Sequence, residues 1–71
     1  MEKEHLIKKL GERIREIRKQ KNMSQKQLAH LIGKDQQSIQ RLEIGKMNPT
    51  IYYLFEICEG LGVPIEDIIK L

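Results

Sequence analysis

The stretch SQKQLAHLIGKDQQSIQRLEIGKMNP, residues 24–49, contains the signals that decide the fold. Ser24 offers a hydroxyl that can cap a helix, and Gln27 three residues later completes a Ser-x-x-Gln capping box. A glycine gives the backbone the freedom to end this helix after about two turns, and Asp35 can cap a second helix over residues 36 to about 43. The apolar residues at helical spacing in these two helices are Leu28, Ala29, Ile32, Ile39 and Leu42. The stretch therefore predicts two short helices joined by a tight turn.

Amphipathic helices are predicted on both sides of this pair. Residues 3–20 form the first helix, with apolar positions Leu6, Ile7, Leu10, Ile14 and Ile17. Beyond an Asn-Pro turn, Thr50 caps a longer helix whose expected inner stripe is Ile51, Leu54, Ile57, Cys58 and Leu61. Pro64 opens a last short helix with two acidic residues in its first turn. We expect an all-α fold, a compact five-helix domain that occupies residues 1–71.

Composition narrows the class of protein. The chain has one cysteine and two histidines, which cannot supply an intramolecular disulfide or the paired ligand spacing of a zinc site. Residues 1–47 hold twelve Lys or Arg and six Asp or Glu, a balance of +6, whereas residues 48–71 have a balance of −3. This polarity suggests a basic face directed toward a polyanion, although solvated helix surface is an equally good explanation of charge alone.

The sequence does not indicate an enzyme. It shows no Ser/His/Asp grouping, glycine-rich phosphate loop or carboxylate pair, and 71 residues can hardly build a pocket that excludes water. We expect no metal and no cofactor. The charged amino terminus and the short apolar runs indicate neither a signal peptide nor a membrane span, so we expect a cytoplasmic protein.

Helix pairs joined by a few residues around a glycine fit the helix-turn-helix motif, here at residues 24–43. The stretch also resembles the Cro/C1-type (XRE) helix-turn-helix family, the fold of the lambdoid phage repressors. The matched features are Ser-Gln opening the first helix of the pair, Leu-Ala inside it, a Gly turn, Ile at the centre of the next helix, Leu-Glu-x-Gly-Lys closing it, and a following Pro. The resemblance covers nearly the whole chain. It implies sequence-specific binding of double-stranded DNA by a transcriptional regulator that acts in a repressor-like way.

Four side chains are predicted to read bases, because they remain on the outer face after Ile39 and Leu42 are buried: Gln36, Gln37, Gln40 and Arg41. Gln pairs best with adenine and Arg with guanine. The Gln-Gln-Ser-Ile run also resembles the start of a recognition helix in a phage repressor in which both glutamines read bases. The family resemblance places Gln25 on the DNA backbone, and Lys26, Lys34, Ser38 and Lys46 are candidates for further phosphate contacts. Solvated surface is an equally good explanation of each lysine.

Arg18 and Glu43 match a pair that forms a partly buried salt bridge in the family. Three residues depart from the family pattern: Asp35 stands where Ser or Thr is common, Ile44 where a polar residue touches the backbone, and Pro64 where a Ser or Asp cap is usual. None of the three breaks the core pattern.

The sequence is compatible with two kinds of protein partner. The apolar last helix favours a homodimer, formed through the C-terminal helices, on a pseudo-palindromic operator. Tyr52, Tyr53 and Phe55 cannot all face inward, so at least one aromatic side chain is exposed. The alternative is a protein-interaction module of the same fold, such as an antitoxin-like protein that binds another protein.

Overall fold

The computed structural model describes residues 2–71, and these contain five helices and no strand. The helices are α1 (Lys3–Gln20), α2 (Gln25–Leu31), α3 (Gln36–Glu43), α4 (Ile51–Leu61) and α5 (Ile65–Ile68). The all-α fold predicted from the sequence is confirmed, and the helix-turn-helix pair is α2 and α3. No helix in this part of the chain is both long and apolar enough to cross a membrane.

Three of the helices begin at a residue whose side chain caps them. Ser24 Oγ accepts a hydrogen bond from Gln27 N at 3.0 Å while Gln27 Oε1 accepts from Ser24 N at 2.7 Å, which is the predicted capping box. Asp35 Oδ1 caps α3 through Ser38 N at 2.8 Å, and Thr50 caps α4. Each cap satisfies an amide that would otherwise lack an intrahelical partner, which fixes where the helix begins.

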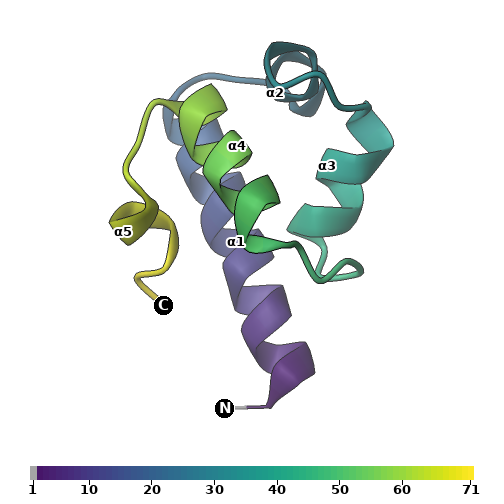
Figure 1. Ribbon diagram of the computed structural model, residues 1–71, viewed down its shortest axis with the longest axis vertical. Coiled ribbons are helices and arrows are strands. Elements are labelled where there is room, and N and C mark those ends of the chain that lie inside the picture. Colours follow the sequence, from purple (N-terminus) through teal and green to yellow (C-terminus); the bar gives the residue numbers. More distant parts are fainter. Residues whose placement is uncertain (1) are drawn as a thin grey trace.

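One apolar core joins the five helices, and α1 contributes one face to it, passing behind α4 in the view of Figure 1. The fully buried large side chains are Ile14, Leu28, Ile39, Leu42, Ile57 and Ile68. A Cβ atom on Gly11 of α1 would lie 2.7 Å from the carbonyl oxygen of Glu43, so α1 and α3 approach backbone to backbone at this glycine. The glycine thus sets the position of α3 against the core.

The short α5 is held on α1 and α4, on the side of the molecule away from α3 (Figure 1). Pro64 is its N-cap in an extended conformation, without a side-chain cap, so α5 begins at Ile65. Arg13 of α1 donates from Nε to the backbone oxygen of Asp67 at 2.7 Å. This bond and the burial of Ile68 attach the C-terminal end to the core.

The predicted inner stripes are wrong at two helix ends. Ile51 is 65% exposed and Leu6 is 43% exposed. The amino-terminal turns of α1 extend past the other helices, so Leu6 has little to pack against (Figure 1). At the start of α4 the neighbouring α3 lies on the side of Tyr53, which is half-buried, and Ile51 faces away. Helical spacing identifies one face of a helix but not how far a neighbour covers it.

Candidate nucleic-acid interface

The outer face of α3 presents four polar side chains. Gln36, Gln37, Gln40 and Arg41 are all exposed. The opposite face is buried, with Ile39 and Leu42 inaccessible to solvent. Helix α3 is therefore anchored on one side and carries three amides and a guanidinium on the other, groups with the paired donors and acceptors that match base edges.

The exposed face of α3 also includes one apolar residue. Ile44, the C-cap of α3, is 54% exposed. At helical spacing it falls on the same side as Gln37 and Gln40. Ile44 is one of the three positions at which the sequence departs from the family pattern, and here the departure leaves an apolar group at the end of the polar face.

A buried ion pair fixes the carboxyl end of α3. Arg18 Nε lies 2.7 Å from Glu43 Oε2 and Arg18 Nη2 lies 3.1 Å from Glu43 Oε1, a bidentate arrangement. The two residues are 6% and 3% exposed. Arg18 Nη1 also donates to the backbone oxygen of Met23. The bridge predicted between the first and third helices is present, and it also holds the connection between α1 and α2.

Gln25 at the start of α2 is connected to the same ion pair. Its Nε2 donates to Glu43 Oε1 at 3.0 Å, and its side chain is half-buried. Lys26 beside it is exposed, as is Lys46 after α3. Of the side chains predicted to contact phosphates, these two lysines are therefore freely accessible, whereas Gln25 already has a protein partner.

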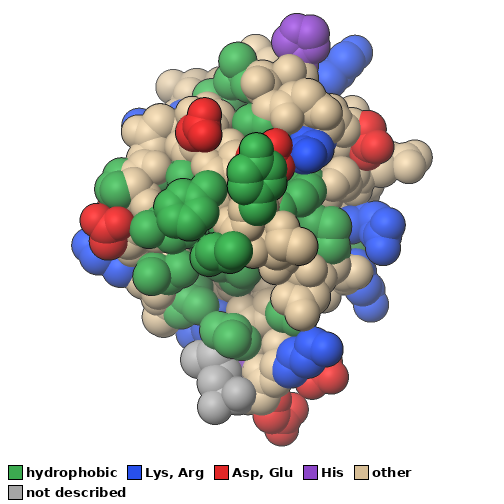
Figure 2. Space-filling view, viewed as in Figure 1, with side chains coloured by type: hydrophobic (Ala, Val, Ile, Leu, Met, Phe, Trp, Pro, Cys, Tyr) green, Lys and Arg blue, Asp and Glu red, His purple; other side chains and the backbone are tan. Residues whose placement is uncertain are grey.

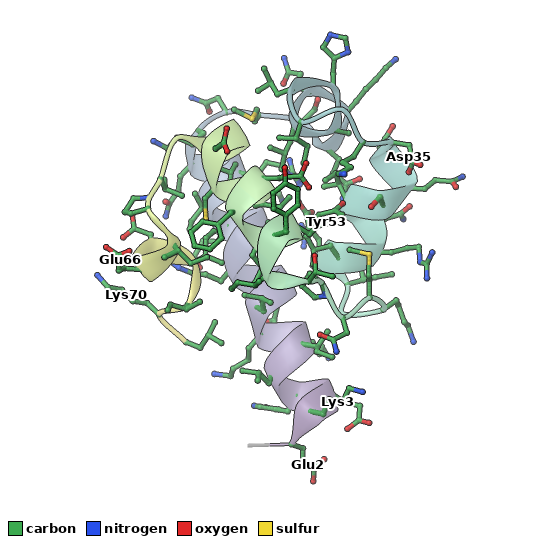
Figure 3. All side chains as sticks on the ribbon, in the orientation of Figure 1. Glu2, Lys3, Asp35, Tyr53, Glu66 and Lys70 are labelled. Atoms are coloured by element: carbon green, nitrogen blue, oxygen red, sulfur yellow. The ribbon has the colours of Figure 1, made fainter. Side chains whose placement is uncertain are left out.

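The other two predicted phosphate contacts, Lys34 and Ser38, also bond within the protein. Ser38 Oγ lies 2.5 Å from the hydroxyl of Tyr53. Lys34 Nζ lies 3.3 Å from Glu56 Oε1 and 5.4 Å from the centre of the Tyr53 ring. Figure 3 shows Tyr53 extending from α4 toward α3. Tyr53 could not be assigned to this site from the sequence, because only the fold brings it together with Ser38, 15 positions away.

An apolar surface lies on the other side of α4. Figure 2 shows hydrophobic side chains gathered over α4 and toward α5. We call this surface the α4–α5 face and define it by Ile51, Phe55, Ile69 and Leu71, which are between 44% and 65% exposed. It is spatially separate from the polar face of α3, because the core lies between α5 and α3.

His30 of α2 and the single cysteine, Cys58 of α4, lie in different surroundings. His30 is exposed on α2, whereas Cys58 is buried on α4. Burial raises the pKa of the Cys58 thiol, and the negative charges of Glu66 and Asp67 raise it further. Within residues 2–71, no three His, Cys, Asp or Glu side chains lie close enough to hold a metal ion.

Comparison with known families and curated proteins shows similarity across most of the chain. The model of the family described as "Helix-turn-helix" matches residues 14–68. An uncharacterized HTH-type transcriptional regulator of Archaeoglobus fulgidus is 39% identical over 56 residues, which are 79% of each chain. An uncharacterized HTH-type transcriptional regulator of Methanocaldococcus jannaschii is 40% identical over 47 residues, which cover 66% of this chain and 71% of the relative.

Solved structures show the same architecture. The restriction-modification controller protein C.AhdI from Aeromonas hydrophila superimposes with a TM-score of 0.91 at 26% identity, over 96% of this chain and 99% of that one. The controller protein C.Esp1396I, solved as a tetramer in complex with its natural operator, superimposes with a TM-score of 0.79 at 33% identity, over 92% of this chain and 96% of that one.

Proposed function

The chain belongs to the helix-turn-helix family, and we propose that it binds double-stranded DNA at specific sequences as a transcriptional regulator, with α3 as its recognition helix. The observation that carries the proposal is the exposure of Gln36, Gln37, Gln40 and Arg41 together on the one face of α3 that the core does not use. A helix of this width fits the major groove, where a bidentate Gln or Arg contact discriminates by about 1–3 kcal/mol against the wrong base.

Phosphate contacts would position this helix without specifying sequence. Lys26 lies in the first turn of α2 and Lys46 just after α3, and both are exposed, so neither is prevented by the fold from contacting the DNA backbone. Gln25, Lys34 and Ser38 are also proposed to contact the backbone, and each would do so while keeping or exchanging its present bond to Glu43, Glu56 or Tyr53. Their protein bonds hold the side chains in place before DNA arrives, which lowers the entropy lost on binding.

The protein is further proposed to act as a homodimer through the α4–α5 face, on a pseudo-palindromic operator, in a repressor-like role. Ile51, Phe55, Ile69 and Leu71 form an exposed apolar surface, and such surfaces on small proteins mark interaction sites. Two copies would place their recognition helices in major grooves one turn apart, about 34 Å. The controller protein C.Esp1396I, which has the same architecture, assembles as a tetramer on its operator.

Selection of bound duplexes from a random DNA pool tests the function. We expect enrichment of a palindrome, with specific binding at least about a thousandfold tighter than binding to scrambled DNA. The variant Gln36→Ala/Gln37→Ala should lose this preference. Gln20→Ala is the matched control, because Gln20 is an exposed glutamine at the end of α1. Weak binding of every sequence by the parent chain would refute sequence-specific recognition.

The dimer is tested by sedimentation equilibrium of the chain without DNA. Ile69→Ser should shift the equilibrium toward the monomer, since Ile69 is 55% exposed on the α4–α5 face. Leu31→Ser is the matched control, because Leu31 is 61% exposed on α2, outside this face. A parent chain that is monomeric, and protects a single asymmetric half-site in a footprint, would rule out the dimer.

The exposed aromatic Phe55 supports a second candidate function, a protein-interaction module of the antitoxin-like kind. The two functions differ in which face is needed. Tight, salt-insensitive binding of a protein by the Gln36→Ala/Gln37→Ala variant, with no DNA affinity in the parent chain, would favour this second function.

A further inference from the structure

The first turn of α3 is joined to α4 by one side-chain hydrogen bond. Ser38, in that turn, lies 2.5 Å through Oγ from the hydroxyl of Tyr53. In the described part of the chain, the other side-chain hydrogen bond of this turn is the local cap from Asp35. The far end of α3 is held separately, through Glu43 and Arg18. The two ends of the recognition helix therefore depend on different partners.

The Tyr53 ring is itself held in place. Lys34, in the turn between α2 and α3, places its ammonium 5.4 Å from the ring centre, within the range of a cation–π contact. The same ammonium lies 3.3 Å from Glu56, three residues after Tyr53 on α4. Lys34 and Glu56 are only partly exposed. Together these contacts keep the hydroxyl directed at Ser38.

We propose that Tyr53 is a positioning residue that sets how Gln36 and Gln37 meet the bases, and so determines part of the specificity of DNA recognition. This inference rests on the proposed function. Gln36 and Gln37 occupy the same turn of α3 as Ser38. A bidentate amide contact requires fixed geometry, so a turn that is free to shift loses discrimination first. Arg41 lies one turn further on, close to the end of α3 that the Arg18–Glu43 pair anchors, so its base contact should be affected less.

The test compares Tyr53→Phe with the parent chain on the selected operator and on all its single-base variants. Tyr53→Phe keeps the ring and its contact with Lys34 but removes the hydroxyl. Discrimination at the base pairs read by Gln36 and Gln37 should fall about two- to tenfold, the equivalent of one hydrogen bond. Discrimination at the base pair read by Arg41 should stay within about twofold of the parent, because Arg41 lies toward the end of α3 that Glu43 holds. A weaker phosphate contact of Ser38 would lower the affinity for every duplex equally, so it would not change the discrimination between duplexes. Gln36→Ala/Gln37→Ala and Arg41→Ala identify which base pairs these are.

Two further variants separate positioning from general stability. Tyr52→Phe is the matched control: Tyr52 precedes Tyr53 on α4, is 72% exposed, and its hydroxyl has no hydrogen bond in the described residues. Ser38→Ala should reproduce the base-specific loss of discrimination, while the loss of its proposed phosphate contact lowers the affinity for all duplexes equally. The double variant Ser38→Ala/Tyr53→Phe should lose no more discrimination than Ser38→Ala alone. All variants are measured at a temperature at which circular dichroism shows each to be fully folded.

The outcomes are distinct. Unchanged discrimination in Tyr53→Phe, or an equal loss at every base pair including that of Arg41, would overturn the positioning role while leaving the proposed function intact. Additive losses in the double variant would also overturn it, because the two hydroxyls would then act independently. A parent chain that prefers no duplex would overturn both the inference and the proposed function.

Discussion

Replacement of Arg18 by alanine should remove a large part of the stability of this protein. The change deletes two bonds to Glu43, at 2.7 and 3.1 Å, and a third to the backbone of Met23. It leaves the Glu43 carboxylate, 3% exposed, with the Gln25 amide as its remaining side-chain donor. One neutral donor cannot replace a bidentate guanidinium, and removal of one partner of a buried pair costs about 3–5 kcal/mol.

This loss is large compared with the total free energy of unfolding of so short a chain. A chain of 71 residues has a free energy of unfolding of about 4–11 kcal/mol at typical values per residue. Arg18→Ala should therefore lower the midpoint of thermal unfolding by more than about 12 °C. Urea denaturation followed by circular dichroism measures the free energy of unfolding directly. The protein concentration is held fixed, because association would also contribute to stability. The slope of the free energy against urea should be unchanged if both proteins unfold to the same extent.

Glu16→Gln is the control for a pair at the surface. Arg13 Nη1 lies 2.5 Å from Glu16 Oε1, but the Glu16 side chain is 59% exposed. Its loss should cost less than about 1 kcal/mol, despite the short distance. A loss of less than about 1 kcal/mol in Arg18→Ala as well would refute the argument that burial makes the Arg18–Glu43 pair critical.

A double variant, Arg18→Met/Glu43→Leu, remains informative even if Arg18→Ala does not fold. It removes both charges and fills the space with apolar groups, so no charge is left buried without a partner. We expect it to be more stable than Arg18→Ala, because the cost of the single change lies mainly in the stranded carboxylate. If the double variant were equally unstable, the loss would have to come from packing and from the bond to Met23.

Three further changes test local features. Gly11→Ala should destabilise the protein by about 1–3 kcal/mol in urea unfolding, because the new Cβ would meet backbone oxygens of α3 that cannot move away. Alanine normally favours a helix over glycine, so a gain in stability would contradict the close approach of α1 and α3. Ser24→Ala should lower the thermal midpoint by about 4–8 °C through loss of a cap worth about 1 kcal/mol, and Ser24→Thr should recover much of it. The Cys58 thiol should react slowly with a disulfide reagent at pH 8 and faster in urea, since burial raises its pKa and the thiolate is the reactive form; equal rates would show that the thiol is accessible in the folded protein.

The sequence predicted the helices well because their ends are marked by local chemistry. Ser24, Asp35 and Thr50 each cap a helix through a bond within three residues. Such bonds depend on the chain nearby and can be anticipated from the order of residues. The exposed face of α3 was predictable for a related reason, because two apolar residues three positions apart settle which side is buried.

Contacts between distant segments were less accessible to prediction. The resemblance to a known family suggested the Arg18–Glu43 pair, but spacing alone would not have done so. Nothing in the sequence signalled Gly11, whose role depends on how closely two backbones pass. The internal bonds of Gln25, Lys34 and Ser38 were also missed, because a polar residue suited to a phosphate is equally suited to a neighbouring side chain.

The first turn of α4 shows why periodicity fails at helix ends. Either Ile51 or Tyr53 could face α3 at the start of α4, and hydrophobicity alone would bury the isoleucine. In the structure Tyr53 lies beside α3 because its hydroxyl reaches Ser38 and its ring meets Lys34, and Ile51 is 65% exposed. A polar tip on an apolar ring can satisfy a hydroxyl that isoleucine would leave without a partner. The same arrangement leaves Ile51 available to the α4–α5 face, so the contact that we propose to position α3 on DNA also determines which residues of α4 a second copy could bind.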